Sequence, residues 1–266
     1  MSALDGEILA LCRDVSDRII LPRYRNRASE EIQDKGGNDP VTIADRESEA
    51  ALREALQRME PGVAVVGEEA ASVDDEVLEG LSADCWIVDP LDGTRNFATG
   101  KPPFGILLAR ASGGATLSGF IYDCLSGRFC TAHLGKGAFV NGERIAAQAT
   151  GATPPVAAIS LIFMEQARRD AIKRHICPHY ALTDIPYCAA EQYPRLALGI
   201  NDVSIFERTL AWDHAAGVLW LNEAGGRAAR VDGSPYRVDG NIYGGLIGAA
   251  TPALFDDLAK RLSALD

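Results

Sequence analysis

The sequence lacks an apolar run of the roughly 18 residues that a membrane-spanning helix needs. Its first residues, Met1 to Glu7, also lack the basic stretch and apolar core of a secretory signal. The six cysteines contain no C-x-x-C pair, which favours reduced, partly buried thiols. We therefore predict a soluble protein of the cytoplasm that does not interact with membranes.

Basic residues are also scarce. The chain has 26 Lys and Arg against 37 Asp and Glu, for a net charge of −11. This balance argues against a nucleic acid partner or an anionic membrane, since both require a basic surface. If the substrate is itself an anion, bound metal ions would have to neutralise a cluster of carboxylates.

Several common catalytic motifs are absent. There is no P-loop, no glycine-rich dinucleotide motif after a strand and no G-x-S-x-G nucleophile elbow. His175 and His179 are four residues apart but lack the H-E-x-x-H context of a zinc site, and His133 and His214 have no partner pattern. Acidic side chains are therefore the main candidates for catalytic or metal-binding residues.

The pattern of apolar residues alternates between helical and strand type over a length that suits one large domain or two packed halves. It predicts helices over about residues 4–24, 42–59, 165–176, 189–198, 212–224 and 251–262. It predicts strands over 63–66, 86–88, 104–109, 117–122, 128–133, 156–160, 203–206 and 244–249, with a hairpin at 137–145. Residues 35–40 and the acidic stretch 70–84 are predicted to be loops.

A stretch rich in threonine, proline and glycine, residues 150–155, marks a boundary. We predict an N-terminal α+β half, residues 1–149, that carries most of the metal ligands. The C-terminal α/β half, residues 150–266, would carry Asp213 and the side chains that face the substrate.

The stretch from Trp86 to Thr94, W-I-V-D-P-L-D-G-T, organises the chain. It predicts a buried strand that ends in a turn, with Asp89 and Asp92 three residues apart and a helix after them. Carboxylates bind hard cations such as Mg²⁺, and helix N-termini bind phosphate. One short segment could therefore hold a metal and the anion it activates, although Asp-Pro and Asp-Gly are also ordinary turn dipeptides.

Five acidic residues lie where a predicted strand ends or a predicted helix begins: Asp45, Glu68, Asp89, Asp92 and Asp213. Any one of them alone has an ordinary structural or solvated role. Together they favour an oxygen-ligand site for more than one metal ion. Such sites hold two ions about 3.5–4 Å apart and stabilise the attacking and leaving oxygens of a phosphoryl transfer.

The chain resembles the inositol monophosphatase family in five segments that occur in the family's order and cover nearly its whole length. They are Val41-Thr-Ile-Ala-Asp45, Gly67-Glu-Glu69, Trp86 to Thr94 with Asn96-Phe97, Gly137-Ala-Phe-Val-Asn-Gly142, and Trp212-Asp-His-Ala-Ala-Gly217 with Glu223-Ala-Gly-Gly226. The resemblance implies an α+β protein with the layered αβαβα sugar-phosphatase fold, in which two intimately packed halves contain mixed β-sheets. It also implies a homodimer.

The resemblance further implies two or three Mg²⁺ ions. Glu68, Asp89 and the backbone carbonyl of Leu91 would hold the first ion. Asp89, Asp92 and Asp213 would hold the second, so that Asp89 bridges the two. A third, weaker ion would bind near Glu68.

The implied reaction is hydrolysis of a phosphate monoester by direct attack of a metal-activated water. Thr94 and Asp45 would orient and deprotonate this water, with Glu68 as a further catalytic residue. Gly93 and Thr94 would offer backbone N–H groups to the phosphate. Lys35 also matches a family position.

The segment beside the substrate departs from the family pattern. Family members usually carry Gly-Ser-Ala-Ala, whereas this chain has Tyr187-Cys-Ala-Ala190. They also tend to have a glutamate seven residues before the W-D aspartate, whereas Glu207 lies six before Asp213. From the resemblance we predict substrate contacts by Ala189 and Glu207, together with the predicted metal ligands Asp92 and Asp213. Glu191, Arg195 and Arg208 are further candidates.

The substrate predicted from the resemblance is a small phosphorylated metabolite, such as an inositol phosphate or a related sugar or polyol phosphate. Histidinol phosphate, fructose 1,6-bisphosphate and a nucleotide 3′-phosphate are alternatives with the same chemistry. An alternative of another class is a binding or regulatory protein on the same fold. A simple Ca²⁺-binding module would need EF-hand spacing within one loop, which the sequence does not contain.

Overall fold

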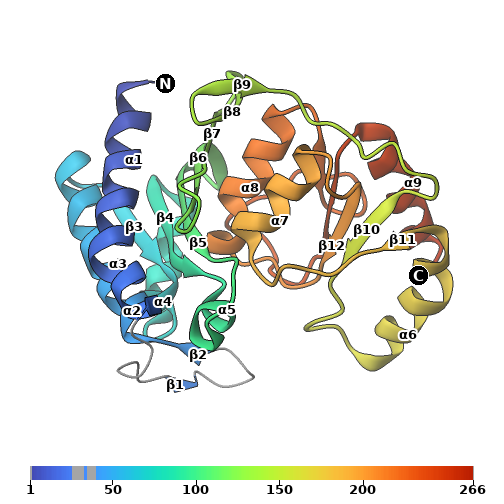
Figure 1. Ribbon diagram of the computed structural model, residues 1–266, viewed down its shortest axis with the longest axis horizontal. Coiled ribbons are helices and arrows are strands. Elements are labelled where there is room, and N and C mark those ends of the chain that lie inside the picture. The colour runs from blue at the N-terminus through green and yellow to red at the C-terminus, as the bar shows by residue number, and fades with distance from the viewer. Residues whose placement is uncertain (1, 26–32, 35–39, 266) are drawn as a thin grey trace.

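The computed structural model describes residues 2–25, 33–34 and 40–265. Figure 1 shows five layers from left to right: helices, a β-sheet, a central pair of helices, a second β-sheet and outer helices. Both sheets combine parallel and antiparallel pairs. The predicted αβαβα architecture with mixed sheets is therefore confirmed.

The first layer contains the two N-terminal helical segments. The predicted helix over 4–24 is α1 (Ala3–Val15), a π-helical turn η1 (Ser16–Ile20) and α2 (Leu21–Arg25) in succession. Helix α3 (Ile43–Met59) follows with Thr42 as its N-cap, and the backbone N–H and the hydroxyl of Thr42 both donate to the Asp45 carboxylate. The helix start therefore holds Asp45 in place.

The larger sheet has seven strands in the order β3-β4-β5-β6-β7-β8-β9, and only β3 and β4 run parallel. The strands are β3 (Ala64–Gly67), β4 (Cys85–Asp92), β5 (Gly105–Ser112), β6 (Ala115–Asp123), β7 (Phe129–His133), β8 (Gly137–Val140) and β9 (Glu143–Ile145). The predicted hairpin joins β8 to β9 through Asn141 and Gly142, whose φ angles of 51° and 86° suit a tight two-residue turn.

The prediction of a loop over 70–84 is wrong. Helix α4 (Glu68–Ala71) and the 3₁₀ helix η3 (Asp75–Ser82) occupy most of it. The buried Glu49 carboxylate accepts the backbone N–H groups of Glu69 and Ala70 at 2.7 and 2.9 Å, which satisfies the first turn of α4 from a distant helix. This capping contact is made by tertiary structure, so local composition could not indicate it.

The second sheet has five strands in the order β11-β10-β12-β14-β13. They are β10 (Val156–Ile159), β11 (Ala181–Leu182), β12 (Val203–Phe206), β13 (Arg227–Ala229) and β14 (Leu246–Ala249). The sequence did not predict β11 and β13, which have two and three residues and too few positions to show a period. Helices α6 (Gln166–His175) and α9 (Pro252–Ser263) and the 3₁₀ turn η4 (Cys177–His179) lie outside this sheet (Figure 1).

The central layer contains α7 (Ala189–Ala197) and α8 (Ala211–Glu223). Helix α8 is buried almost along its whole length, and a Cβ at Gly119 of β6 would lie 2.8 Å from the Ala216 carbonyl oxygen. The Tyr193 ring of α7 occupies the space beside Gly217, where a side chain would collide with it. Close packing on both sides therefore fixes α8, and with it Asp213, against the first sheet.

One hydrophobic core surrounds α8 and takes residues from both sheets, among them Ile87 of β4 and Leu246 of β14. The two predicted halves thus share a core, and their division near residue 150 stays a prediction. The short α5 (Thr94–Thr99), β1 (Gln33–Asp34) and β2 (Pro40–Val41) complete the elements. Lys35 and most of the predicted loop at 35–40 lie outside the described residues.

All six cysteines are free thiols, five of them buried and Cys177 partly so. No helix in the described part of the chain is long and apolar enough to cross a bilayer.

Candidate metal centre

Strand β4 carries two of the predicted metal ligands at its end. The sequence predicted a turn from Asp89 onwards, and this is wrong because β4 continues through Asp92. Asp89 pairs with Leu107 of β5 and Asp92 with Gly105, so three steps on one strand match two on the other. This β-bulge turns both carboxylates to the same side of the strand, which a regular alternation would not do.

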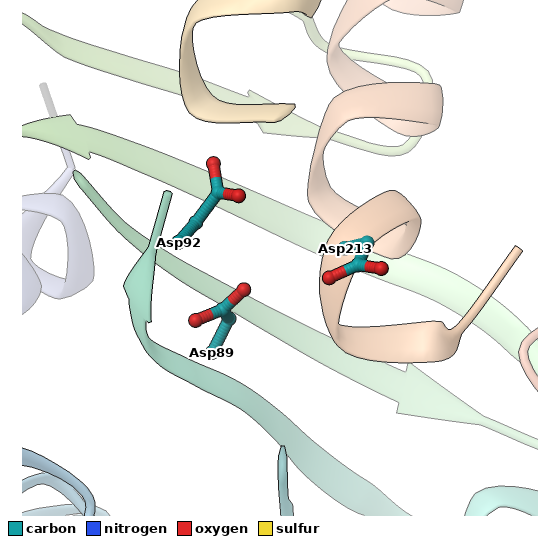
Figure 2. Close-up of side chains that lie close together, drawn as sticks. All are labelled: Asp89, Asp92 and Asp213. Carbon is teal, nitrogen blue, oxygen red and sulfur yellow. The ribbon is translucent and has the colours of Figure 1, made fainter. Parts of the chain in front are cut away.

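Asp213 joins them from the first turn of α8. Figure 2 shows the three carboxylates close together, two from β4 and one from α8. One oxygen atom from each of Asp89, Asp92 and Asp213 lies within 4.8 Å of the other two. The structure thus brings together three of the predicted ligands from segments more than 100 residues apart.

The three carboxylates repel one another in a buried place. Asp89 is 1% exposed, and burial raises its pKa well above the usual range, with further contributions from the charges of Glu68, Asp92 and Asp213. Burial also raises the pKa of Asp92. A hard divalent cation binds such an all-oxygen donor set and removes the repulsion, so these residues fit Mg²⁺.

Asp92 is held by two groups that the sequence did not predict for this role. The backbone N–H of Ala190 donates to Asp92 Oδ2 at 2.6 Å, and the Cys188 thiol donates to the same oxygen at 3.0 Å. Both belong to the start of α7, where Cys188 is the N-cap. The only sequence signal was the departure from Gly-Ser-Ala-Ala, which marks the place but not the contact.

Asp45 and Thr94, the two residues predicted to act on the attacking water, are in contact. The Thr94 hydroxyl lies 3.1 Å from Asp45 Oδ1 and 2.9 Å from the Leu91 carbonyl oxygen. Burial raises the pKa of Asp45 to about 7, against the lowering effect of its hydrogen bonds from Thr42 and Thr94. A carboxylate with this pKa can take or release a proton near neutral pH.

Gly93 and Glu68 are two further predicted residues close to the acidic cluster. Gly93 caps α5 with a φ of 85°, and a Cβ there would lie 2.9 Å from the Pro103 carbonyl oxygen. Glu68 begins α4 directly after β3 and lies near enough to raise the pKa of Asp89. Glu49, which holds the start of α4 and was not predicted, therefore also positions Glu68.

A cavity of about 250 Å³ is lined by Glu68, Asp89, Asp92, Gly93, Thr94 and Asp213 among other residues. Of the predicted substrate contacts, Ala189, Glu207 and Arg208 line it. Glu191 and Arg195 are not part of its lining, and Glu191 instead pairs with Arg128 at 2.6 Å and with Arg195 at 2.9 Å. His214 also lines the cavity, where burial lowers its pKa to about 3 and keeps it neutral.

Comparison with known proteins shows the family of the chain. Residues 8–265 match the inositol monophosphatase family. The chain belongs to this family. Members of the inositol monophosphatase family are phosphomonoesterases that bind divalent metal ions, and the cluster of Asp89, Asp92 and Asp213 provides the corresponding acidic residues here.

Relatives within the inositol monophosphatase family carry two kinds of name. The Nus factor SuhB of Haemophilus influenzae is 33% identical over 240 residues, covering 84% of each chain. The inositol-1-monophosphatase of Bacillus subtilis is 31% identical over 202 residues, covering 75% of each. The crystal structure of the extragenic suppressor protein suhB from Bartonella henselae superimposes with a TM-score of 0.83 at 25% identity, covering 98% of each chain.

Proposed function

We propose that this protein hydrolyses a small phosphate monoester with the help of two or three Mg²⁺ ions. The observation that carries the proposal is the cluster of Asp89, Asp92 and Asp213, whose oxygens lie within 4.8 Å of one another beside the contact between Thr94 and Asp45. An acidic ion site next to a proton-accepting pair supports water attack on a phosphate.

Four acidic residues that line the cavity and one backbone carbonyl would hold the ions. Glu68, Asp89 and the Leu91 carbonyl would hold one ion, and Asp89, Asp92 and Asp213 a second. A third would bind near Glu68. Bound divalent ions supply two things: a lowered pKa for a coordinated water and positive charge against the phosphate oxygens.

The chain itself would move the proton. The Thr94 hydroxyl has one hydrogen and two acceptors within reach, Asp45 Oδ1 and the Leu91 carbonyl oxygen. When the carbonyl serves as a metal ligand, the hydroxyl donates to Asp45 and turns a lone pair towards the attacking water. Asp45, with a pKa near 7, then accepts the proton through Thr94. The backbone N–H groups of Gly93 and Thr94, at the start of α5, would bind the phosphate.

For the substrate we propose a phosphorylated metabolite of the inositol phosphate, sugar or polyol type. Support comes from the Bacillus subtilis relative, which is named an inositol-1-monophosphatase. Histidinol phosphate, fructose 1,6-bisphosphate and a nucleotide 3′-phosphate remain alternatives.

The test is phosphate release from inositol 1-phosphate, fructose 1,6-bisphosphate, histidinol phosphate, glycerol 2-phosphate and adenosine 3′,5′-bisphosphate, with Mg²⁺ and with EDTA. We expect release from at least one compound with Mg²⁺ and none with EDTA. Release that persists in EDTA would contradict the proposed metal dependence.

A second candidate function is binding of a macromolecular partner on the same fold, supported by the name Nus factor that the Haemophilus influenzae relative carries. A chain that binds Mg²⁺ but releases phosphate from no compound would favour it. Because the net charge is −11, we predict that this partner is not a nucleic acid. A homodimer and a cytoplasmic location also stay predictions.

A further inference from the structure

Two aromatic residues at the cavity have an uncommon backbone conformation. Phe163 has a φ of 64° and Tyr187 a φ of 53°, both in the left-handed region. Among the described residues, the other non-glycine residue with positive φ is Asn141, in the β8–β9 turn. Asparagine tolerates this region, whereas bulky side chains adopt it only at an energetic cost.

Core packing does not account for these two positions. Phe163 is 48% exposed and Tyr187 is 52% exposed, so each ring leaves about half of its surface in water. Both rings line the same cavity as the acidic cluster. Backbone strain combined with exposed aromatic surface at a binding cavity points to a role in contacting a ligand.

The residues next to the two rings in the cavity lining are mainly apolar. Ile162, Ile185 and Pro186 line the cavity beside them. The Cζ atom of Arg208 lies 4.0 Å from the centre of the Phe163 ring, so the guanidinium and the ring form a cation–π contact. This surface, formed by Ile162, Phe163, Ile185, Pro186, Tyr187 and Arg208, is hereafter the aromatic wall.

The aromatic wall suits a planar group better than a polyol. A polyol needs hydrogen-bond partners for each hydroxyl, and apolar side chains leave those hydroxyls unsatisfied. Glu207 is the nearby acid predicted to contact hydroxyls, but it forms an ion pair with Arg168 at 3.3 Å. A flat ring can instead stack on Phe163 and Tyr187 through its faces, which form no strong hydrogen bonds to water.

We propose that the substrate is a phosphate monoester whose alcohol carries an aromatic or heteroaromatic ring. The phosphate would bind at the acidic cluster of Asp89, Asp92 and Asp213, and the ring would bind on the aromatic wall. This inference rests on the proposed phosphatase function. Among the substrates considered there, it favours the ring-bearing ones, histidinol phosphate and a nucleotide 3′-phosphate, over inositol, sugar and polyol phosphates.

The test compares kcat/KM for two ring-bearing esters, histidinol phosphate and adenosine 3′-phosphate, with two polyol esters, inositol 1-phosphate and glycerol 2-phosphate. We expect the wild-type protein to prefer a ring-bearing ester. Phe163→Ala and Tyr187→Gly should each lower kcat/KM about tenfold on ring-bearing esters, as loss of one stacking contact does, and less than about twofold on polyol esters.

One test variant and two control variants separate loss of the ring from loss of folding. Tyr187→Gly removes the ring at a position whose φ favours glycine, so its melting temperature should stay within about 2 °C of wild type. Tyr187→Phe keeps the ring and should keep the preference. Tyr243→Ala removes a ring that is 60% exposed and outside the cavity lining, and it should change neither preference nor rate.

Binding separates this inference from the proposed function. Calorimetry with adenosine 3′-phosphate and glycerol 2-phosphate in the presence of Mg²⁺ needs no turnover, and the ring-bearing ester should bind at least about tenfold more tightly. If this preference holds and Tyr187→Gly abolishes it, the aromatic wall selects ring-bearing phosphate esters even where no phosphate is released. Equal binding of both esters, or equal losses on both classes in the variants, would overturn the inference and leave the phosphatase proposal intact.

Discussion

The floor and the aromatic wall of the cavity are built in different ways. The floor is the acidic cluster of Asp89 and Asp92 on β4 and Asp213 on α8, together with the contact between Thr94 of α5 and Asp45 of α3. All of these side chains lie on regular elements. The aromatic wall comes mainly from irregular segments around Phe163 and Tyr187, outside the helices and strands. Chemistry that needs fixed ligand positions lies on rigid elements, whereas contacts that select a leaving group lie on loops.

The two regions also differ in how their side chains are held. Asp92 accepts hydrogen bonds from Ala190 and Cys188, and Asp45 accepts them from Thr42 and Thr94. The rings of the aromatic wall are half exposed. Changes in the floor should therefore affect every substrate alike, and changes in the aromatic wall should alter only the choice among substrates.

The largest effect is expected for Asp92→Asn. It removes one charge from the metal cluster at almost constant volume, so turnover of every substrate should fall at least about 1,000-fold while the fold is retained. Steady-state kinetics with Mg²⁺ and a melting curve check both parts. Asp14→Asn, at an exposed position on α1, is the control and should leave the rate unchanged. Wild-type turnover in Asp92→Asn would mean that the metal assignment is wrong.

The next effect concerns proton transfer in the floor. Thr94→Ala removes the hydroxyl between Asp45 and Leu91, so kcat should fall about 100-fold on all substrates. The Mg²⁺ concentration for half-maximal rate should change little, and Thr94→Ser should restore most of the activity. Equal losses in kcat and in Mg²⁺ affinity would instead indicate a structural role.

A smaller effect is expected at the boundary between floor and wall. Cys188 lines the cavity and donates to Asp92, so Cys188→Ala should weaken Mg²⁺ binding about tenfold, as loss of a hydrogen bond to a metal ligand does. Cys188→Ser keeps a donor and should bind Mg²⁺ nearly as the wild type. Calorimetric titration with Mg²⁺ compares the three proteins. If the alanine and serine variants bind Mg²⁺ equally well, the thiol does not position Asp92.

The smallest effect is on stability and pH. Without metal, Asp89 and Asp92 have raised pKa values and that of Asp45 is about 7, so the folded state binds more protons than the unfolded state above about pH 4. Their contribution to the free energy of unfolding therefore falls as pH rises towards 7. Bound Mg²⁺ offsets this loss, so the rise in melting temperature that Mg²⁺ causes should be at least about 4 °C larger at pH 8 than at pH 5.5.

The Mg²⁺ increment is the right quantity because other groups titrate in the same range. The pKa of His214 is lowered to about 3, so its contribution to stability rises with pH up to about 6.5, opposite to that of the carboxylates. This contribution cancels when melting temperatures with and without Mg²⁺ are compared at one pH. A Mg²⁺ increment that is the same at both pH values would contradict the proposed origin of the raised pKa values.

Much of the fold could be predicted because local sequence patterns indicate its helices, strands and turns. The helices predicted over 42–59 and 212–224 correspond to α3 and α8, and Asn141-Gly142 located the β8–β9 hairpin. The failures have a shared cause. Helix α4 forms at the start of the predicted loop because Glu49 caps it from another helix, and β4 extends through Asp92 because β5 continues to pair with it.

By itself, the sequence determined which residues could bind metal, since carboxylates at strand and helix ends are visible in the chain. It also determined the family, through motifs that keep their order. Only the tertiary structure decided that the bulge in β4 turns Asp89 and Asp92 to one side, that α8 brings Asp213 to them, and that Cys188 supports Asp92. The aromatic wall was likewise invisible, because Phe163 and Tyr187 are 24 positions apart and share a cavity only after folding. The physical reason is that ligand distances and cavity linings depend on packing between distant segments, which local spacing does not encode.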